Sequence, residues 1–206
     1  FLEFIDYKLK DLMTKNYLNN TLKARIVLEI AHAMNYLYKL GHIHRDLNAD
    51  NIMLNSVFHV KIIDFGMAKI NECLFDTETL NTVSMTKGIG AYEFMSPEMI
   101  NEEDYDNKTD VYSFGIVLYF LFVGSLPKQS IAEKAKSISI KMPSPSNYIS
   151  KFCIELIEEC LSNNPEDRPS FEMIIEKLKN NLYGLASNVD KEIVSRRHHE
   201  LDQLIS

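Results

Sequence analysis

Three oxygen-bearing side chains, Asp46, Asn51 and Asp64, follow one another closely along the chain. A carboxylate can accept a proton from a reacting group, and carboxylate and amide oxygens are the hard ligands that magnesium requires. Between Asn51 and Asp64 lie two short apolar runs separated by polar turn residues, a pattern that predicts a small hairpin. From the residues alone two interpretations stay open. The three side chains form a magnesium-dependent catalytic site, or they merely cap turns.

The sequence around these side chains resembles two motifs of protein kinases. His44 to Asn51 (HRDLNADN) is similar to the catalytic loop of that family, and Asp64 to Gly66 (DFG) is similar to its metal-binding motif. At roughly 1 in 20 per fixed position, a chance match runs on the order of one in a billion per starting point. The order of the motifs and their hairpin-sized separation therefore favour the catalytic interpretation.

The resemblance implies a role for each matched residue. Phosphoryl transfer is catalysed mainly by positioning the reactants and by neutralising charge on the transferred group. Asp46 would accept or orient the proton of the attacking hydroxyl, and Asn51 and Asp64 would hold magnesium. The implied cofactors are ATP and Mg2+, and the implied partners are ATP and a protein substrate.

Later motifs resemble structural positions of the same family. Ser96-Pro97-Glu98 is similar to the motif that closes the activation segment, with serine in place of the usual alanine. Asp110 opens a run (DVYSFG) that resembles the start of the central helix, whose aspartate hydrogen-bonds the backbone of the catalytic loop. Arg168 matches the arginine that pairs with the glutamate carried here by Glu98, and His44 is also expected to be structural. The DVYSFG and RPSF runs are most similar to the tyrosine-kinase-like group of serine/threonine kinases.

Two positions depart from the serine/threonine kinase pattern. Asn48 stands where these kinases usually have a lysine, and Ala91 stands where they usually have a threonine. In the family those two residues contact the catalytic aspartate and the transferring phosphate, so Asn48 is counted among the catalytic residues here. Their loss leaves a second interpretation open, a catalytically weak, pseudokinase-like scaffold or interaction module.

Arg45 precedes the catalytic aspartate, which marks the kinases often switched by phosphorylation of the activation loop, because a buried arginine can pair with a phosphate. The best candidate site is Thr86, followed by Ser84 and Thr82. The alternative is that this hydroxyl-rich stretch is a solvated loop that is never modified.

The start of the chain resembles the hinge between the two kinase lobes. Glu3 and Phe4 correspond to the positions whose backbone meets adenine, and Met53 lies on the expected floor of the nucleotide site. In protein kinases a glycine-rich loop and a strand lysine precede the hinge. We therefore expect the N-terminal β lobe to be absent from these 206 residues, with flanking domains possible outside them.

Helical periodicity and apolar runs indicate the elements that hold these motifs. Apolar residues recur at helical spacing over Thr21 to Leu40, and Thr109 to Val123 is apolar nearly all round, which is typical of a buried helix. Further helices are predicted over Ser130 to Ser137, Lys151 to Leu161 and Ser170 to Leu182. We divide the chain into a kinase domain with hinge and C-terminal lobe, residues 1–184, and a tail or linker, residues 185–206. For that tail a solvated helix or a linker is favoured over a working site.

Composition excludes several other classes. The chain is 46% hydrophobic and 25% charged, within the ordinary range for globular domains, and its net charge is -7. This charge disfavours nucleic-acid binding. The most apolar run is too short to span a bilayer, and three sparse cysteines favour reduced thiols, so a cytoplasmic protein without membrane insertion is expected. Four further histidines lack metal-ligand spacing, which favours surface or packing roles: His32, His59, His198 and His199.

The prediction is therefore a mostly α fold, the large lobe of a protein kinase, with a small β-hairpin region at the catalytic loop. The expected function is transfer of the γ-phosphate of ATP to serine or threonine hydroxyls of proteins in signalling, with activity depending on the missing lobe.

Overall fold

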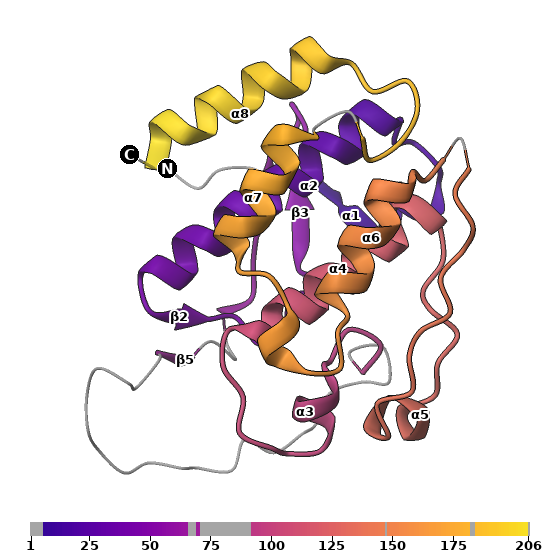
Figure 1. The fold of residues 1–206 in the computed structure, drawn as a ribbon. Coiled ribbons are helices and arrows are strands. Elements are labelled where there is room, and N and C mark those ends of the chain that lie inside the picture. Colours follow the sequence, from indigo (N-terminus) through magenta and orange to yellow (C-terminus); the bar gives the residue numbers. More distant parts are fainter. Residues whose placement is uncertain (1–5, 66–68, 71–91, 147, 182–183, 206) are drawn as a thin grey trace.

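The computed structural model describes residues 6–65, 69–70, 92–146, 148–181 and 184–205, with the side chains of 69, 70 and 205 outside that description (Figure 1). The described residues are mostly helical, with a small antiparallel sheet, as the sequence predicts. No helix among them is long and apolar enough to cross a membrane.

The central helix is α4, Lys108–Val123, and every residue from Thr109 to Phe122 is buried. A helix that is apolar on all sides must be covered on all sides, and the other helices do this. At Gly115 a Cβ atom would lie 2.8 Å from the Cβ of Cys160, so the glycine allows α4 and α6 to approach closely. The helix ends at Gly124, whose φ of 83° is left-handed. The predicted buried helix is confirmed.

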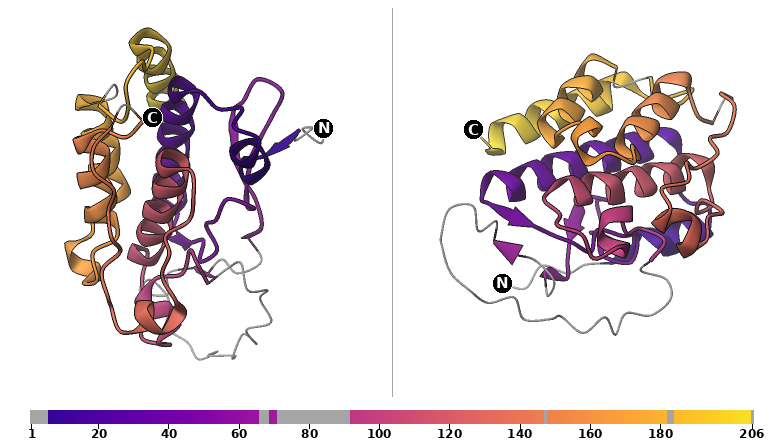
Figure 2. Two further views of the ribbon diagram at one scale, coloured as in Figure 1. Left: turned by 90° about the vertical axis from the view of Figure 1, so that its right-hand side faces the viewer. Right: turned by 60° about the horizontal axis from the view of Figure 1, so that its bottom comes forward.

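Three amphipathic helices pack around α4. They are α2 (Asn20–Lys39), α6 (Lys151–Cys160) and α7 (Phe171–Asn180), each within about two residues of its predicted bounds. Each begins at a side-chain cap, from Asn19, Ser150 and Ser170, which accepts a hydrogen bond from a backbone N–H of the first turn. In Figure 2, α2 and α4 form a middle layer, with α6 and α7 on one side and the sheet with α1 on the other.

The predicted hairpin is present. β3 (Ile52–Leu54) pairs antiparallel with β4 (Val60–Ile62), with Ile52 opposite Ile62, and β1 (Tyr7–Lys8) adds to the other edge of β3. A separate antiparallel pair joins β2 (His42–Ile43) to β5 (Lys69–Ile70). The catalytic-loop sequence runs between β2 and β3, so both of its ends are fixed by strands.

Besides a 3-10 helix at Pro165–Asp167, three short α-helices belong to the domain. They are α1 (Leu9–Thr14), α3 (Pro97–Ile100) and α5 (Ile131–Ala135). The last one lies within the predicted segment and starts with a capping box, in which Ser130 and Glu133 bond to each other's backbone N–H.

The C-terminal helix α8, Lys191–Ile205, lies across the molecule beside α2 and α7 (Figure 1). The sequence favours a solvated helix or a linker here. The segment is a helix, but one face of it is buried, through Val194, His198 and Leu201. These residues recur at helical spacing, so the segment packs against the domain. The boundary after residue 184 stays a prediction.

Candidate active site

Asp46 lies at the centre of the loop between β2 and β3, and two side-chain amides hold its carboxylate. The Asn48 Nδ2 donates to Asp46 Oδ1 over 3.0 Å, and the Asn51 Nδ2 donates to Asp46 Oδ2 over 3.0 Å. Both amides also donate to the backbone oxygen of Asp46, at 3.1 and 2.9 Å. The carboxylate is thereby fixed in one orientation, as a proton-accepting group needs to be.

Asn48 also organises the loop through its oxygen. The Oδ1 atom accepts hydrogen bonds from the backbone N–H of Asp50, at 2.9 Å, and of Asn51, at 3.1 Å. The side chain is almost completely buried. Sequence reasoning identified Asn48 only as the place where a lysine is missing. The structure adds that its amide oxygen caps the turn that presents Asn51. This role could have been predicted from the sequence, because asparagine side chains often bond to backbone groups two or three residues further along the chain.

Asp110, in the first turn of α4, anchors the same loop. Its carboxylate accepts hydrogen bonds from the backbone N–H of His44, at 2.7 Å, and of Arg45, at 2.8 Å. These contacts match what the kinase resemblance implies for this aspartate. They hold Arg45 at a φ of 66°, a left-handed conformation that costs energy for a non-glycine residue. Burial raises the pKa of Asp110 to about 6, although the two backbone bonds and Arg45 act in the opposite direction.

His44 joins the loop to the segment that carries Asp64. Its Nδ1 accepts from the backbone N–H of Asp46, at 3.2 Å, so the proton of a neutral ring resides on Nε2, which faces the carbonyl oxygen of Ile63 at 3.1 Å. The Ile63 N–H in turn donates to the carbonyl of Asn51, at 3.0 Å. Asp64 follows immediately, with a φ of 62° and an exposed side chain. These bonds place Asn51, just before β3, and Asp64, just after β4, close together at the open end of the hairpin, which forms one edge of the site.

The donor set at this edge fits magnesium. The amide nitrogen of Asn51 is committed to Asp46, which leaves its oxygen as the atom that can face a cation. Asp64 supplies a carboxylate, so both side chains offer the hard oxygens that magnesium requires. Met53 lies on β3, partly buried and opposite Lys61, next to this edge. Glu3 and Phe4, expected at the adenine position, lie outside the described residues.

Arg45 contributes a cation beside the loop. Its guanidinium stacks over the ring of Tyr105 at 5.1 Å. Its Nε is buried and has no hydrogen-bond partner within the described part of the chain. The expected phosphorylation site Thr86, its neighbours Ser84 and Thr82, and Ala91 lie outside that part.

Glu98 of α3 and Arg168 form a bidentate ion pair in the interior, as the resemblance implies. The two N–O distances are 2.6 and 2.9 Å, and both side chains are buried. Arg168 also donates to the carbonyl oxygens of Ser162 and Lys108. Burial acts to raise the pKa of Glu98, but the hydrogen bonds and charge of Arg168 outweigh it and hold that pKa below its usual range. The pair ties the segment after residue 92 to the helical core.

Two further contacts on this segment were missed by sequence reasoning. Ser96 is fully buried, and its hydroxyl is 2.7 Å from that of Thr109 in α4, which explains how serine is accommodated where the family usually has alanine. Lys134 of α5 is also buried and donates to the carbonyl oxygens of Tyr92 and Glu93. A lysine in a short amphipathic helix carries no signal of such a role in the sequence alone.

Comparison with known proteins agrees with this geometry. The family model described as the protein kinase domain matches residues 1–178. The chain is 36% identical over 166 residues to a probable serine/threonine-protein kinase of Dictyostelium discoideum, covering 78% of this chain and 17% of that protein. It is 38% identical over 160 residues to the serine/threonine/tyrosine-protein kinase HT1 of Arabidopsis thaliana, covering 75% of this chain and 39% of HT1. The chain thus spans less than half the length of either relative. From its motifs and these matches, the chain belongs to the protein kinase domain family.

Proposed function

We propose that this chain is the catalytic large lobe of a protein kinase that transfers the γ-phosphate of ATP to serine or threonine hydroxyls of proteins. The observation that carries the proposal is the held carboxylate of Asp46, with one oxygen bonded to Asn48 and the other to Asn51. A carboxylate so oriented is suited to accept a proton from a hydroxyl that attacks phosphorus.

In the proposed reaction the substrate hydroxyl gives its proton to Asp46 as its oxygen bonds to the γ-phosphorus. The bond from that phosphorus to the bridging oxygen breaks, and ADP leaves with the bonding electrons. Asn51 and Asp64 would hold magnesium, which neutralises phosphate charge when it is bound. The described residues include no glycine-rich loop or strand lysine, so the remaining grip on the phosphates is proposed to come from outside residues 1–206.

Hydrogen bonds within the chain hold the backbone that presents these groups. Asp110 holds the start of the loop, and His44 and the Asn51 carbonyl hold Ile63, the residue before Asp64. Loss of any of these contacts would shift the groups relative to one another, and shifts of about 1 Å can cost on the order of a hundredfold in rate.

The test uses the full-length protein with radiolabelled ATP, Mg2+ and a mixed protein substrate. Wild type is expected to label serine and threonine, whereas Asp46→Asn and Asp64→Ala are expected to lose labelling. Phosphoamino-acid analysis decides whether tyrosine is also labelled, as the name of HT1 suggests for that relative.

The alternative, a pseudokinase-like scaffold, is favoured by the two departures from the serine/threonine kinase pattern, Asn48 in place of lysine and Ala91 in place of threonine. Under that alternative the wild type shows no transfer above the Asp46→Asn background. This result would reject the proposed enzyme while leaving the fold and family unchanged.

A further inference from the structure

Two buried histidines meet between α2 and α8, far from the catalytic loop. His32 of α2 and His198 of α8 are 4% and 5% exposed, and His32 Nε2 lies 3.1 Å from His198 Nδ1. Asp202 follows one helical turn after His198, with its Oδ2 3.7 Å from His198 Nε2. The histidines are 166 residues apart in sequence, so sequence spacing could not reveal that they meet.

Packing alone accounts for this cluster incompletely. The hydrogen bond between the rings uses one nitrogen of each. His198 Nε2 is buried and has no hydrogen-bond partner in the described residues, and its separation from Asp202 is too long for a hydrogen bond. A buried polar atom without a partner is costly and calls for an explanation, such as an ion at the site.

The spacing of the donor atoms suits a transition metal. One nitrogen of each ring and one oxygen of Asp202 all lie within 4.8 Å of one another. Zinc binds histidine and carboxylate at about 2.0–2.2 Å in a tetrahedron, which separates neighbouring ligand atoms by about 3.3 Å. The unpartnered His198 Nε2 lies 3.7 Å from Asp202 Oδ2, somewhat farther than that value. The 3.1 Å contact of His32 Nε2 is with the other ring nitrogen, His198 Nδ1, so binding of one ion through His198 Nε2 would replace this hydrogen bond. Asp202 is exposed, so its side chain has room to change rotamer.

We propose that His32, His198 and Asp202 bind one Zn2+ ion, which fastens α8 to α2. Two imidazoles and a carboxylate form a donor set that suits zinc better than magnesium or calcium. Water would fill the fourth position, on the exposed side of Asp202. The ion would be structural, and the site is separate from the oxygen ligands Asn51 and Asp64.

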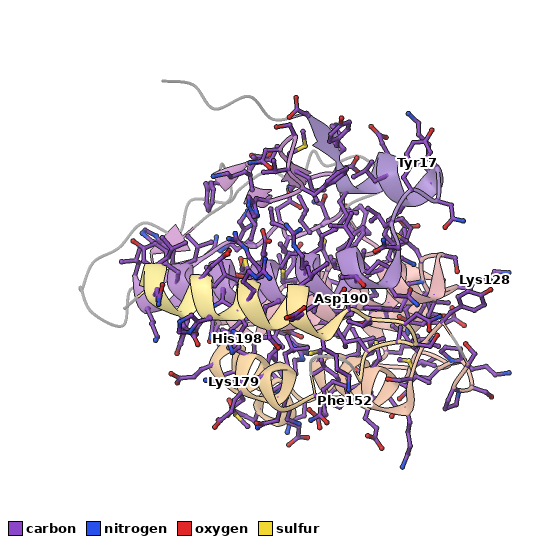
Figure 3. All side chains as sticks on the ribbon, turned by 90° about the horizontal axis from the view of Figure 1, so that it is seen from above. Tyr17, Lys128, Phe152, Lys179, Asp190 and His198 are labelled. Carbon is purple, nitrogen blue, oxygen red and sulfur yellow. The ribbon has the colours of Figure 1, made fainter. Side chains whose placement is uncertain are left out.

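A positive charge near Asp202 predicts the direction in which one variant should change zinc affinity. Lys179 of α7 lies 3.8 Å from Asp202, in an exposed ion pair that costs little to break. In Figure 3, which looks down on α8, His198 and Lys179 are labelled on the same side of that helix. A metal ion at Asp202 would be repelled by this lysine, so removing Lys179 should strengthen zinc binding.

The other charged group near the site, Arg197, is already paired with Glu29 and Glu200. Burial, then the neighbouring His198, lower the pKa of His32 to about 4, so its imidazole is neutral near pH 7.

The experiment is calorimetric titration of ZnCl2 into the full-length, chelator-treated protein, in excess Mg2+ so that oxygen sites are filled. Wild type is expected to bind one Zn2+ at this site. His198→Ala should abolish that binding, and Asp202→Asn should weaken it on the order of 10- to 100-fold. Lys179→Ala should strengthen it severalfold. His199→Ala removes an exposed histidine next to His198 and is the matched control, with unchanged affinity.

Two further readouts separate a site from a folding defect. Co2+ bound in place of zinc should give the intense visible absorption of a tetrahedral complex in wild type and His199→Ala, and not in His198→Ala. Asp202→Asn changes a partly exposed side chain, so its fold should survive, as circular dichroism would verify. The proposal is overturned if the wild type binds no Zn2+ or if Asp202→Asn binds it as tightly as the wild type.

Discussion

At the scale of single residues, the carboxylate of Asp46 and the amides around it form one unit. Asn48 donates to one carboxylate oxygen and Asn51 to the other, while the Asn48 oxygen caps the N–H groups of Asp50 and Asn51. Asn48 therefore orients the carboxylate of Asp46 through a hydrogen bond, where a lysine would add a positive charge. An amide supplies no net charge to the phosphate, so under the proposed function we expect phosphate transfer to depend on the geometry at Asp46 more than on a local positive charge.

Asn48→Asp should lower phosphate transfer by about tenfold or more with a smaller loss of stability. The new carboxylate keeps the oxygen that caps the turn but faces Asp46 at about 3 Å, and two like charges at that distance favour retention of a proton on one of them. Transfer should therefore also move to higher pH. The measurement is the pH profile of turnover of the full-length protein. Asn55→Asp is the control, because it makes the same substitution in the hairpin turn after β3. The same change in the pH profile of turnover in both variants would contradict this role of Asn48.

The Glu98–Arg168 pair is the clearest buried charge pair in the described structure. Truncating either residue to alanine should lower the free energy of unfolding by about 3–5 kcal/mol, because the other charge is left buried without its partner. Urea unfolding measures the loss. Lys151→Ala breaks an exposed pair with Glu155 and should change stability by less than about 1 kcal/mol. Equal losses in Glu98→Ala and Lys151→Ala would show that burial of the pair contributes nothing.

At the scale of elements, periodicity predicted the long helices and could not predict contacts between distant segments. α2 and α4 were predictable because their apolar residues recur or run continuously. β1 was not, since Tyr7 and Lys8 gain strand character only from Met53 and Leu54 opposite them. The docking of Asp110 on His44 was expected only from family resemblance, because no local pattern links residues 66 positions apart.

Asp110→Asn should loosen the link between α4 and the catalytic loop. One of the two backbone N–H groups would face an amide NH2 in place of an accepting oxygen, at a cost of about 1–3 kcal/mol. The pKa of Asp110 is raised to about 6 by burial. The folded state therefore holds a proton that the unfolded state releases above about pH 4, and the stability from this group falls as the pH rises to about 6. Urea unfolding should show that the difference in free energy of unfolding between wild type and Asp110→Asn decreases from pH 4 to pH 6. A difference that increases over this pH range would contradict a raised pKa for Asp110.

The docking of α8 can be tested through Arg197. Its guanidinium donates to Glu29 at 2.9 Å, and Glu29 is buried in α2 and also accepts from the backbone N–H of Val60. Arg197→Ala should lower the free energy of unfolding by about 1–3 kcal/mol, because a buried carboxylate loses a charged donor. Arg196→Ala removes an exposed arginine from the same helix and should have little effect. Equal effects in urea unfolding would mean that α8 does not belong to the cooperative unit.

At the scale of the whole molecule, the layers explain how one loop is held from several directions. α4 supports it through Asp110, the hairpin presents Ile63 and Asp64 beside it, and α3 is tied to the helical core through Arg168. The sequence identified which residues could do chemistry. Their convergence could be predicted only through the kinase resemblance, since it depends on contacts between elements from both halves of the chain.

This large lobe by itself is not expected to transfer phosphate at a useful rate. Catalysis requires the γ-phosphate in line with the attacking hydroxyl, and fixing both reactants is worth about 7–11 kcal/mol of the barrier. The described residues orient Asp46 and offer oxygen ligands for magnesium, but supply no covering loop or strand lysine for the phosphates. One reactant would therefore be held weakly even though the catalytic loop is well ordered by its own hydrogen bonds.

The measurement compares ATP affinity and phosphate transfer of residues 1–206 with those of a polypeptide extended upstream through any glycine-rich loop and strand lysine that its gene encodes. Weaker ATP binding and little transfer are expected from the shorter polypeptide, with circular dichroism and cooperative unfolding as evidence that it has folded. Comparable transfer from both would mean that the large lobe positions the γ-phosphate unaided. Its grip on the nucleotide would then have to come from the edge formed by Met53, Asn51 and Asp64, which makes Met53→Ala in the shorter polypeptide the next variant to measure.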